Sequence, residues 1–133
     1  MFGNTTKRLL AVDDDVASAE LIVRVAERFQ YEAFATSDSR GVMNLASALS
    51  PDVIVIDIRM PNLDADDLLV LLADAGYQGQ IMVVSGQEQS ILQRTQQHAV
   101  TLGLREPFVL QKPVDMGMLR QCLLACREQK AAA

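Results

Sequence analysis

The 133 residues of this chain suffice for one domain with a single hydrophobic core. Half of the residues are hydrophobic and the formal net charge is −5, so the chain lacks the excess of Lys and Arg that a nucleic-acid backbone binder needs. No apolar stretch approaches the roughly 20 residues of a membrane span, and residues 1–7 carry no apolar signal region. We therefore expect one globular domain with a cytoplasmic location and neither nucleic acid nor membrane as a partner.

Five short segments are predicted to form strands. Four of them contain continuous apolar runs, which fit strands that are buried on both faces, as in a parallel sheet. The segments between the strands are long enough for a helix each, and this alternation predicts helices on both faces with right-handed crossovers. In chain order the predicted strands are 8–12 (RLLAV), about 31–35, 53–56 (VIVI), 81–84 (IMVV) and about 108–111.

Apolar residues recur at helical spacing after each of these strands. We expect Ser37 to cap the second helix, Gly76 to end the third and Asp115 to cap the fifth. The sequence thus predicts a single domain over residues 1–133, with a structured core at about 7–128. Residues 129–133 are interpreted as a tail or the start of a linker.

The two cysteines and the single histidine are the residues of this sequence that would suit a zinc ion. Cys122 and Cys126 are one helical turn apart, and we interpret them as small core residues of the last helix, with a disulfide or a metal pair as the alternatives. His98 lies in a Gln-rich helical stretch without a nearby cysteine. A zinc site is therefore not expected.

Polar residues stand where the predicted strands end. The first strand leads into Asp13, Asp14 and Asp15, the third into Asp57, the fourth into Ser85 and the fifth into Lys112. In an open parallel sheet, ligands collect beyond the carboxyl ends of the strands. All of these side chains are therefore expected at one edge of one sheet.

Three carboxylates at one point raise each other's pKa unless a cation compensates. Oxygen ligands with little nitrogen or sulfur favour a hard cation, and we expect Mg²⁺ at Asp13, Asp14 and Asp57. A divalent ion there would gather phosphate oxygens for phosphoryl transfer, with Lys112 as a further positive charge. Asp57 is the best candidate for the nucleophile, because it ends the middle strand. Asp15 is either a helix cap or a further member of this cluster.

Four segments carry a resemblance to the receiver domain of two-component response regulators. They are AVDDD at 11–15, VIVIDIRMPN at 53–62, VVSG at 83–86 and LQKPV at 110–114. The resemblance covers essentially the full length of the chain, and the combination of the four segments is specific. It implies a flavodoxin-like, doubly wound α/β fold with five parallel strands in the order 2-1-3-4-5.

The resemblance also implies roles for the acidic residues. Asp57 would be the phosphoacceptor, Asp14 would bind Mg²⁺ directly and Asp13 would act mainly through a coordinated water. The backbone carbonyl of Arg59 would be a further ligand of the metal.

By the same resemblance, Ser85 would bind a phosphoryl oxygen and Lys112 would pair with the phosphoryl group. The bond between Lys112 and Pro113 is expected to be cis. This chain departs from many receivers three residues before the lysine, where Val109 replaces an aromatic residue. The nearest aromatic, Phe108, is one residue away and should point to the opposite face of the sheet.

A receiver domain would act as a phosphorylation-dependent switch and not as an enzyme that turns over an external substrate. The expected partners are a sensor histidine kinase or a histidine phosphotransfer protein. An output domain or downstream partner would bind through the fourth helix, fifth strand and fifth helix, and a second copy of the chain is a further candidate.

Two alternatives to this function remain open. One is a receiver-fold interaction module with little or no phosphorylation. The other is a receiver cut from a larger regulator, with a cyclic-di-GMP phosphodiesterase as one candidate output. A flavin-binding flavodoxin is disfavoured, because three aspartates after the first strand would repel a phosphate in the absence of a metal.

Overall fold

The computed structural model describes residues 6–58, 65–86 and 88–129. Five parallel strands form one sheet in the order β2-β1-β3-β4-β5, which confirms the predicted fold. Each predicted strand lies within one residue of the observed bounds at either end. The strands are β1 (Arg8–Val12), β2 (Glu32–Thr36), β3 (Val53–Asp57), β4 (Gln80–Ser85) and β5 (Phe108–Gln111).

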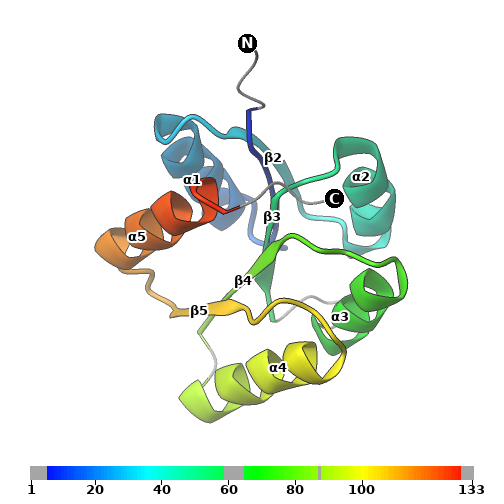
Figure 1. Cartoon of the computed structure of the whole chain (residues 1–133). Coiled ribbons are helices and arrows are strands. Elements are labelled where there is room, and N and C mark those ends of the chain that lie inside the picture. The colour runs from blue at the N-terminus through cyan, green and yellow to red at the C-terminus, as the bar shows by residue number, and fades with distance from the viewer. Residues whose placement is uncertain (1–5, 59–64, 87, 130–133) are drawn as a thin grey trace.

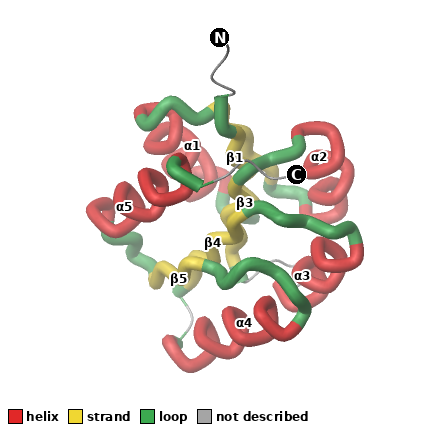
Figure 2. Tube along the Cα trace, viewed as in Figure 1, coloured by secondary structure: helices red, strands yellow, loops and turns green. Residues whose placement is uncertain are grey.

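Helices cover both faces of the sheet, so that the strands lie in the middle layer (Figure 2). The helices α1 and α5 pack on one face, and α2, α3 and α4 pack on the other (Figure 1). Their bounds are α1 (Val16–Arg28), α2 (Val42–Leu49), α3 (Ala65–Asp74), α4 (Gln89–Thr101) and α5 (Met116–Arg127).

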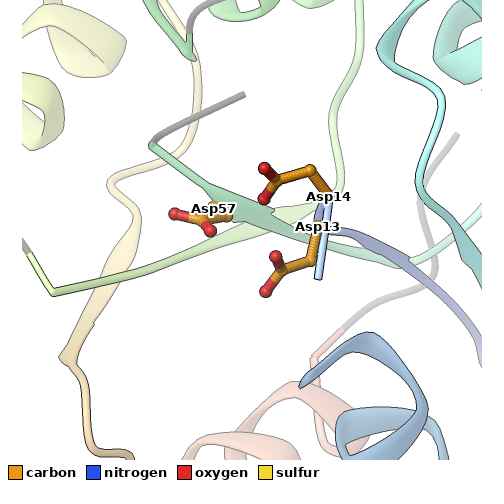
Figure 3. Close-up of side chains that lie close together, drawn as sticks. All are labelled: Asp13, Asp14 and Asp57. Carbon is orange, nitrogen blue, oxygen red and sulfur yellow. The ribbon is translucent and has the colours of Figure 1, made fainter. Parts of the chain in front are cut away.

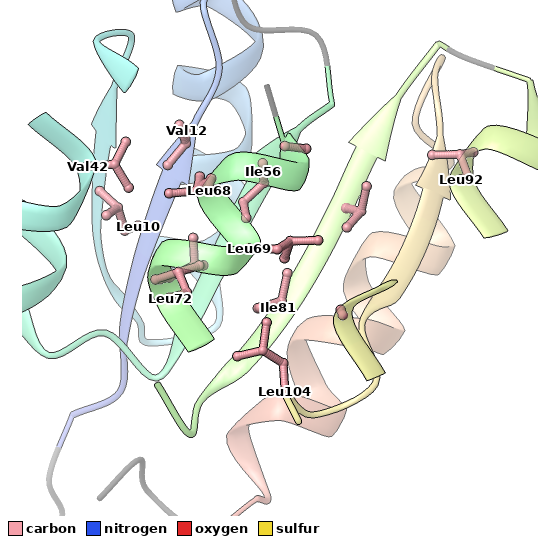
Figure 4. Packing of buried hydrophobic residues seen from close by; sticks show 14 residues of the cluster. Leu10, Val12, Val42, Ile56, Leu68, Leu69, Leu72, Ile81, Leu92 and Leu104 are labelled. Carbon is pink, nitrogen blue, oxygen red and sulfur yellow. The ribbon is translucent and has the colours of Figure 1, made fainter. Parts of the chain in front are cut away.

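Two clusters of buried side chains hold these layers together. Alternate residues of each strand point to opposite faces, so both faces of the central strands are apolar. Leu68, Leu69 and Leu72 of α3 pack on one face against strand residues such as Ile56 and Ile81 (Figure 4). On the other face, residues of α1 and α5 pack on the buried residues at the alternate strand positions, which are Leu9, Ala11, Val53, Val55, Met82, Val84 and Leu110.

The predicted ends of the third and fifth helices are confirmed. Gly76 has a φ of 74°, and its N–H donates to the Ala73 carbonyl oxygen at 3.0 Å, which closes the last turn after α3. The carboxylate of Asp115 accepts hydrogen bonds from the N–H groups of Gly117 (2.8 Å) and Met118 (3.2 Å) at the start of α5.

The prediction that Ser37 caps the second helix is wrong. A short 3-10 turn at Ser39–Gly41 precedes α2, and Gly41 is the N-cap residue without a side-chain hydrogen bond. Thr36 Oγ1 accepts from the Asp38 N–H at 3.1 Å, and Asp38 Oδ1 accepts from the Arg40 N–H at 2.9 Å. These polar side chains stabilise a turn at the place where the sequence suggested a helix start.

Cys126 and Cys122 lie in the layer of α1 and α5, as predicted for core residues. Cys126 is buried and Cys122 is partly buried, and neither is in a disulfide. Burial raises the pKa of the Cys126 thiol to about 12, which disfavours the reactive thiolate at neutral pH. None of the helices in the described parts of the chain has the length and apolar character that a membrane span requires.

Candidate functional site

Three carboxylates meet at the carboxyl edge of the sheet (Figure 3). Asp13 and Asp14 directly follow β1, and Asp57 is the last residue of β3. Because β1 pairs with β3 in parallel register, these strand ends lie next to each other. One carboxylate oxygen from each residue lies within 4.8 Å of the others. Asp13 and Asp57 are buried, whereas Asp14 is exposed to solvent.

Lys112 brings a positive charge to two of these carboxylates. It follows β5, and its Nζ donates to Asp13 Oδ2 at 3.0 Å and to Asp57 Oδ2 at 3.3 Å. Burial lowers the pKa of Lys112, but the hydrogen bond to Asp13 and the charges of both carboxylates outweigh this effect. The pKa of Lys112 therefore lies above its ordinary value, and the side chain is a cation at neutral pH.

Burial also has the largest effect on the pKa of Asp13. It raises the pKa of this carboxyl group above its ordinary value, and the negative charge of Asp57 adds to the shift. The Asp15 N–H, which donates to Asp13 Oδ1 at 2.9 Å, and the Lys112 ammonium act in the opposite direction. One lysine thus compensates only part of the negative charge that three carboxylates concentrate here.

Ser85 is the last residue of β4, the strand next to β3, and is only 2% exposed. Its backbone carbonyl accepts a hydrogen bond from the Lys112 N–H at 2.8 Å, which ties the ends of β4 and β5 together. The bond between Lys112 and Pro113 is cis, as predicted. The fold therefore brings Asp13, Asp14, Asp57, Ser85 and Lys112 to one edge of the sheet.

Asp15, which the sequence left open, is a helix cap. Its carboxylate accepts from the Ala17 N–H at 3.1 Å and from Ser18 Oγ at 2.9 Å. These hydrogen bonds, that from Ser18 foremost, lower the pKa of Asp15. The backbone of Asp15 has a second role that the sequence did not reveal, since its N–H is a hydrogen-bond donor to Asp13. Arg59, the remaining predicted metal ligand, lies outside the described residues.

Comparison with known proteins decides the family. Residues 9–124 match the family model of the response regulator receiver domain. The chain belongs to this family. Receiver domains are signalling switches, and those of response regulators interact with histidine kinases and output domains.

Individual relatives agree with this assignment. The chain is 27% identical to the Regulator of RpoS of Escherichia coli over 121 residues, which are 90% of this chain and 34% of that protein. A signal receiver domain from Bermanella marisrubri is 31% identical, with a TM-score of 0.75 over 92% of this chain and 98% of that one. A response regulator from Colwellia psychrerythraea shares the fold at 21% identity, with a TM-score of 0.81 over 95% and 100% of the two chains. The chain spans about a third of the length of the curated relatives it matches first.

This receiver domain lacks an aromatic residue at the strand position three residues before Lys112. Val109 packs with the cluster that faces α2, α3 and α4, whereas Phe108 packs with the cluster on the side of α1 and α5. The two side chains therefore lie on opposite faces of β5, as the one-residue offset predicts. The Phe108 ring therefore does not replace the missing aromatic side chain at position 109, because it lies on the other face of the sheet.

The donors of the acidic site fit a hard divalent cation. Receiver domains generally bind Mg²⁺ at an acidic pocket, and three carboxylates converge here without a sulfur or imidazole donor among them. Carboxylate oxygens are the ligands that Mg²⁺ prefers, whereas zinc favours nitrogen and sulfur. His98, the single histidine, lies elsewhere and contacts Asp66 Oδ1 of α3 through Nδ1 at 3.1 Å.

Proposed function

We propose that this receiver domain is a phosphorylation-dependent switch that accepts a phosphoryl group on Asp57. The donor would be the phosphohistidine of a sensor histidine kinase or of a histidine phosphotransfer protein. The observation that carries the proposal is the position of the Asp57 carboxylate at the end of the central strand β3. There it lies 3.3 Å from the Lys112 ammonium and beside Asp13 and Asp14.

Each side chain has a part in such a transfer. Asp57 is the nucleophile that attacks phosphorus in line with the leaving group. Lys112 is close enough to Asp57 to stabilise the negative charge of the transferring phosphoryl oxygens. The Ser85 hydroxyl, from the adjacent strand end, binds one of these oxygens once the phosphoryl group is attached.

The acidic residues would hold Mg²⁺ during this reaction. Asp13, Asp14 and Asp57 supply carboxylate oxygens, and the backbone carbonyl of Arg59 is proposed as a further ligand. When bound, the ion neutralises charge on the phosphoryl oxygens. Asp13 would act mainly through a coordinated water and Asp14 by direct contact.

Phosphorylation would then shift an existing equilibrium between two conformations. We expect the change to run through Ser85 and residues 86–104 to the surface of α4, β5 and α5, where an output domain, a downstream partner or a second copy binds. A ring rotation at position 109 is not part of this response. Valine has one short branched side chain and cannot exchange a buried for an exposed position as a ring does.

Direct labelling tests the proposal. Incubation with a small acyl phosphate and Mg²⁺ should attach about one acid-labile phosphate per chain, since Asp57 is the one proposed acceptor. Chelation of Mg²⁺ should suppress the labelling. If the well-folded protein takes up no phosphate from an acyl phosphate or from a phosphohistidine donor, the domain is the interaction module with little or no phosphorylation.

Mg²⁺ alone should raise the melting temperature, because a cation relieves the repulsion among the three carboxylates. At a concentration of 100 times Kd the gain in stability is about 2.7 kcal/mol. Asp14→Ala should lose most of this gain in a thermal unfolding experiment. Asp74→Ala, at the exposed end of α3, is the matched control and should keep it. An equal Mg²⁺ effect in the Asp14 variant and the wild type would place the ion elsewhere.

A further inference from the structure

The end of α5 is fastened to the amino edge of the sheet, on the side away from the acidic site. Gln129 lies two residues after α5 and accepts hydrogen bonds from two basic side chains. Lys7 Nζ donates to its backbone carbonyl at 2.5 Å, and Arg105 Nη1 donates to its Oε1 at 2.6 Å. Its own Nε2 donates to Gln80 Oε1 at 3.2 Å. We call Lys7, Gln80, Arg105 and Gln129 the C-terminal clasp. Gln129 is the first residue of the segment 129–133 that the sequence predicts as a tail or the start of a linker, and it is hydrogen-bonded to the domain.

Gln80 gives the clasp a buried anchor. It is the first residue of β4 and is only 2% exposed. Its Nε2 donates to the carbonyl oxygens of Ile81 (3.0 Å) and Glu106 (2.9 Å), so both amide hydrogens are directed to the backbone. Its Oε1 accepts from Gln129. A buried amide oxygen is costly to leave without a partner, so the contact favours a docked Gln129.

The clasp brings the start of β4 and the connection from α4 to β5 together at the end of α5. The strand β4 begins with Gln80 and ends with Ser85, so one hydrogen-bonded element connects the clasp to the site. The connection from α4 to β5 contributes Arg105 and the carbonyl of Glu106. A hydrogen bond ties this connection to α4, since Gln96 Nε2 of α4 donates to the Pro107 carbonyl at 2.7 Å.

We propose that the C-terminal clasp couples the α4–β5 connection to the end of α5. A displacement of α4 and of this connection moves Arg105 and the Glu106 carbonyl. The hydrogen bonds of Gln129 then weaken, and the end of α5 is released from the sheet. This coupling rests on the proposed function for its trigger at Asp57. The clasp itself is present in the unphosphorylated structure and can be tested there.

Amide hydrogen exchange at Glu128 and Gln129 measures the clasp directly, because their N–H groups make the last hydrogen bonds of the helix, to Ala125 and Cys126. Gln129→Ala and Arg105→Ala should each lower the protection of Glu128 by about tenfold, as the loss of one or two hydrogen bonds allows. The matched control is Arg127→Ala, at the last residue of α5. It removes an exposed hydrogen bond from Arg127 to Gln30, which lies after α1. This control should change protection by less than about twofold. Equal protection in wild type, Arg105→Ala and Gln129→Ala would overturn the clasp.

Beryllium fluoride with Mg²⁺, an acyl phosphate mimic, tests the coupling. In wild type, the protection of Glu128 should fall by about threefold or more together with changes at Ser85 and Leu104. In Gln129→Ala, Ser85 and Leu104 should still respond while Glu128 does not. A Glu128 that is unaffected in wild type, or that responds equally in both proteins, refutes the coupling. If Ser85 and its surroundings do not respond in wild type, the proposed switch itself fails, and the exchange of the unmodified variants still decides whether the clasp exists.

Discussion

Asp57→Asn should abolish the incorporation of acid-labile phosphate, a loss of at least about 10²-fold in labelling rate. Asparagine preserves the shape of the side chain, but its amide is not a nucleophile. Lys112 also donates to Asp13 at 3.0 Å, and the substitution leaves both partners of this hydrogen bond in place. Mass spectrometry of the intact protein after exposure to an acyl phosphate and Mg²⁺ measures the effect.

Asp66→Asn is the matched control for this experiment. Asp66 is an exposed aspartate of α3 that contacts His98 and lies outside the acidic cluster, so its variant should be labelled like the wild type. Circular dichroism must show that both variants are folded. Stoichiometric labelling of the Asp57 variant would contradict its role as acceptor and would move the nucleophile to Asp13 or Asp14.

Leu69→Ala should destabilise the domain by about 2–5 kcal/mol, a large part of the roughly 5–15 kcal/mol by which a domain is stable. The Leu69 side chain is fully buried between α3 and the sheet (Figure 4). Its removal gives up apolar burial and leaves a cavity that the surrounding side chains fill only in part. Urea unfolding followed by circular dichroism gives the change in the free energy of unfolding.

The same helix offers a control for the loss of buried surface. Leu71 lies two residues further along α3 and is 42% exposed. Leu71→Ala should change stability by no more than about 0.5 kcal/mol, because most surface substitutions have small effects. Similar losses of unfolding free energy in both variants would contradict the assignment of the loss at Leu69 to its burial in the core.

Most of the fold was predictable, because local patterns and long-range packing agree in the strands. Continuous apolar runs end at polar residues, and these two signals locate four of the five strands within a residue. The start of α2 was not predictable in the same way. Several hydroxyl and acidic residues follow β2, and any of them could cap a helix. The observed turn uses Thr36 and Asp38 instead of Ser37, a choice that depends on geometry that sequence spacing does not contain.

The site was predictable to a similar extent, and for a related reason. Parallel strands deliver their carboxyl ends to one edge, so Asp13, Asp57 and Lys112 could be placed together from strand positions alone. Contacts between residues that belong to no sequence motif could not be predicted from the sequence. Gln80 and Gln129 are 49 positions apart and Asp66 and His98 are 32 apart, and nothing in either pair distinguishes it from other polar residues.

The two-sided packing of the sheet has a consequence for the evolution of this domain. Among the described residues, the buried cluster of α1 and α5 and that of α2, α3 and α4 draw on different helices and on alternate positions of the same strands. A change of side-chain volume in one layer can therefore be compensated by side chains of the same layer, without a substitution in the other. Each helical layer can diverge to suit a different binding partner while the strand ends continue to present the same carboxylates.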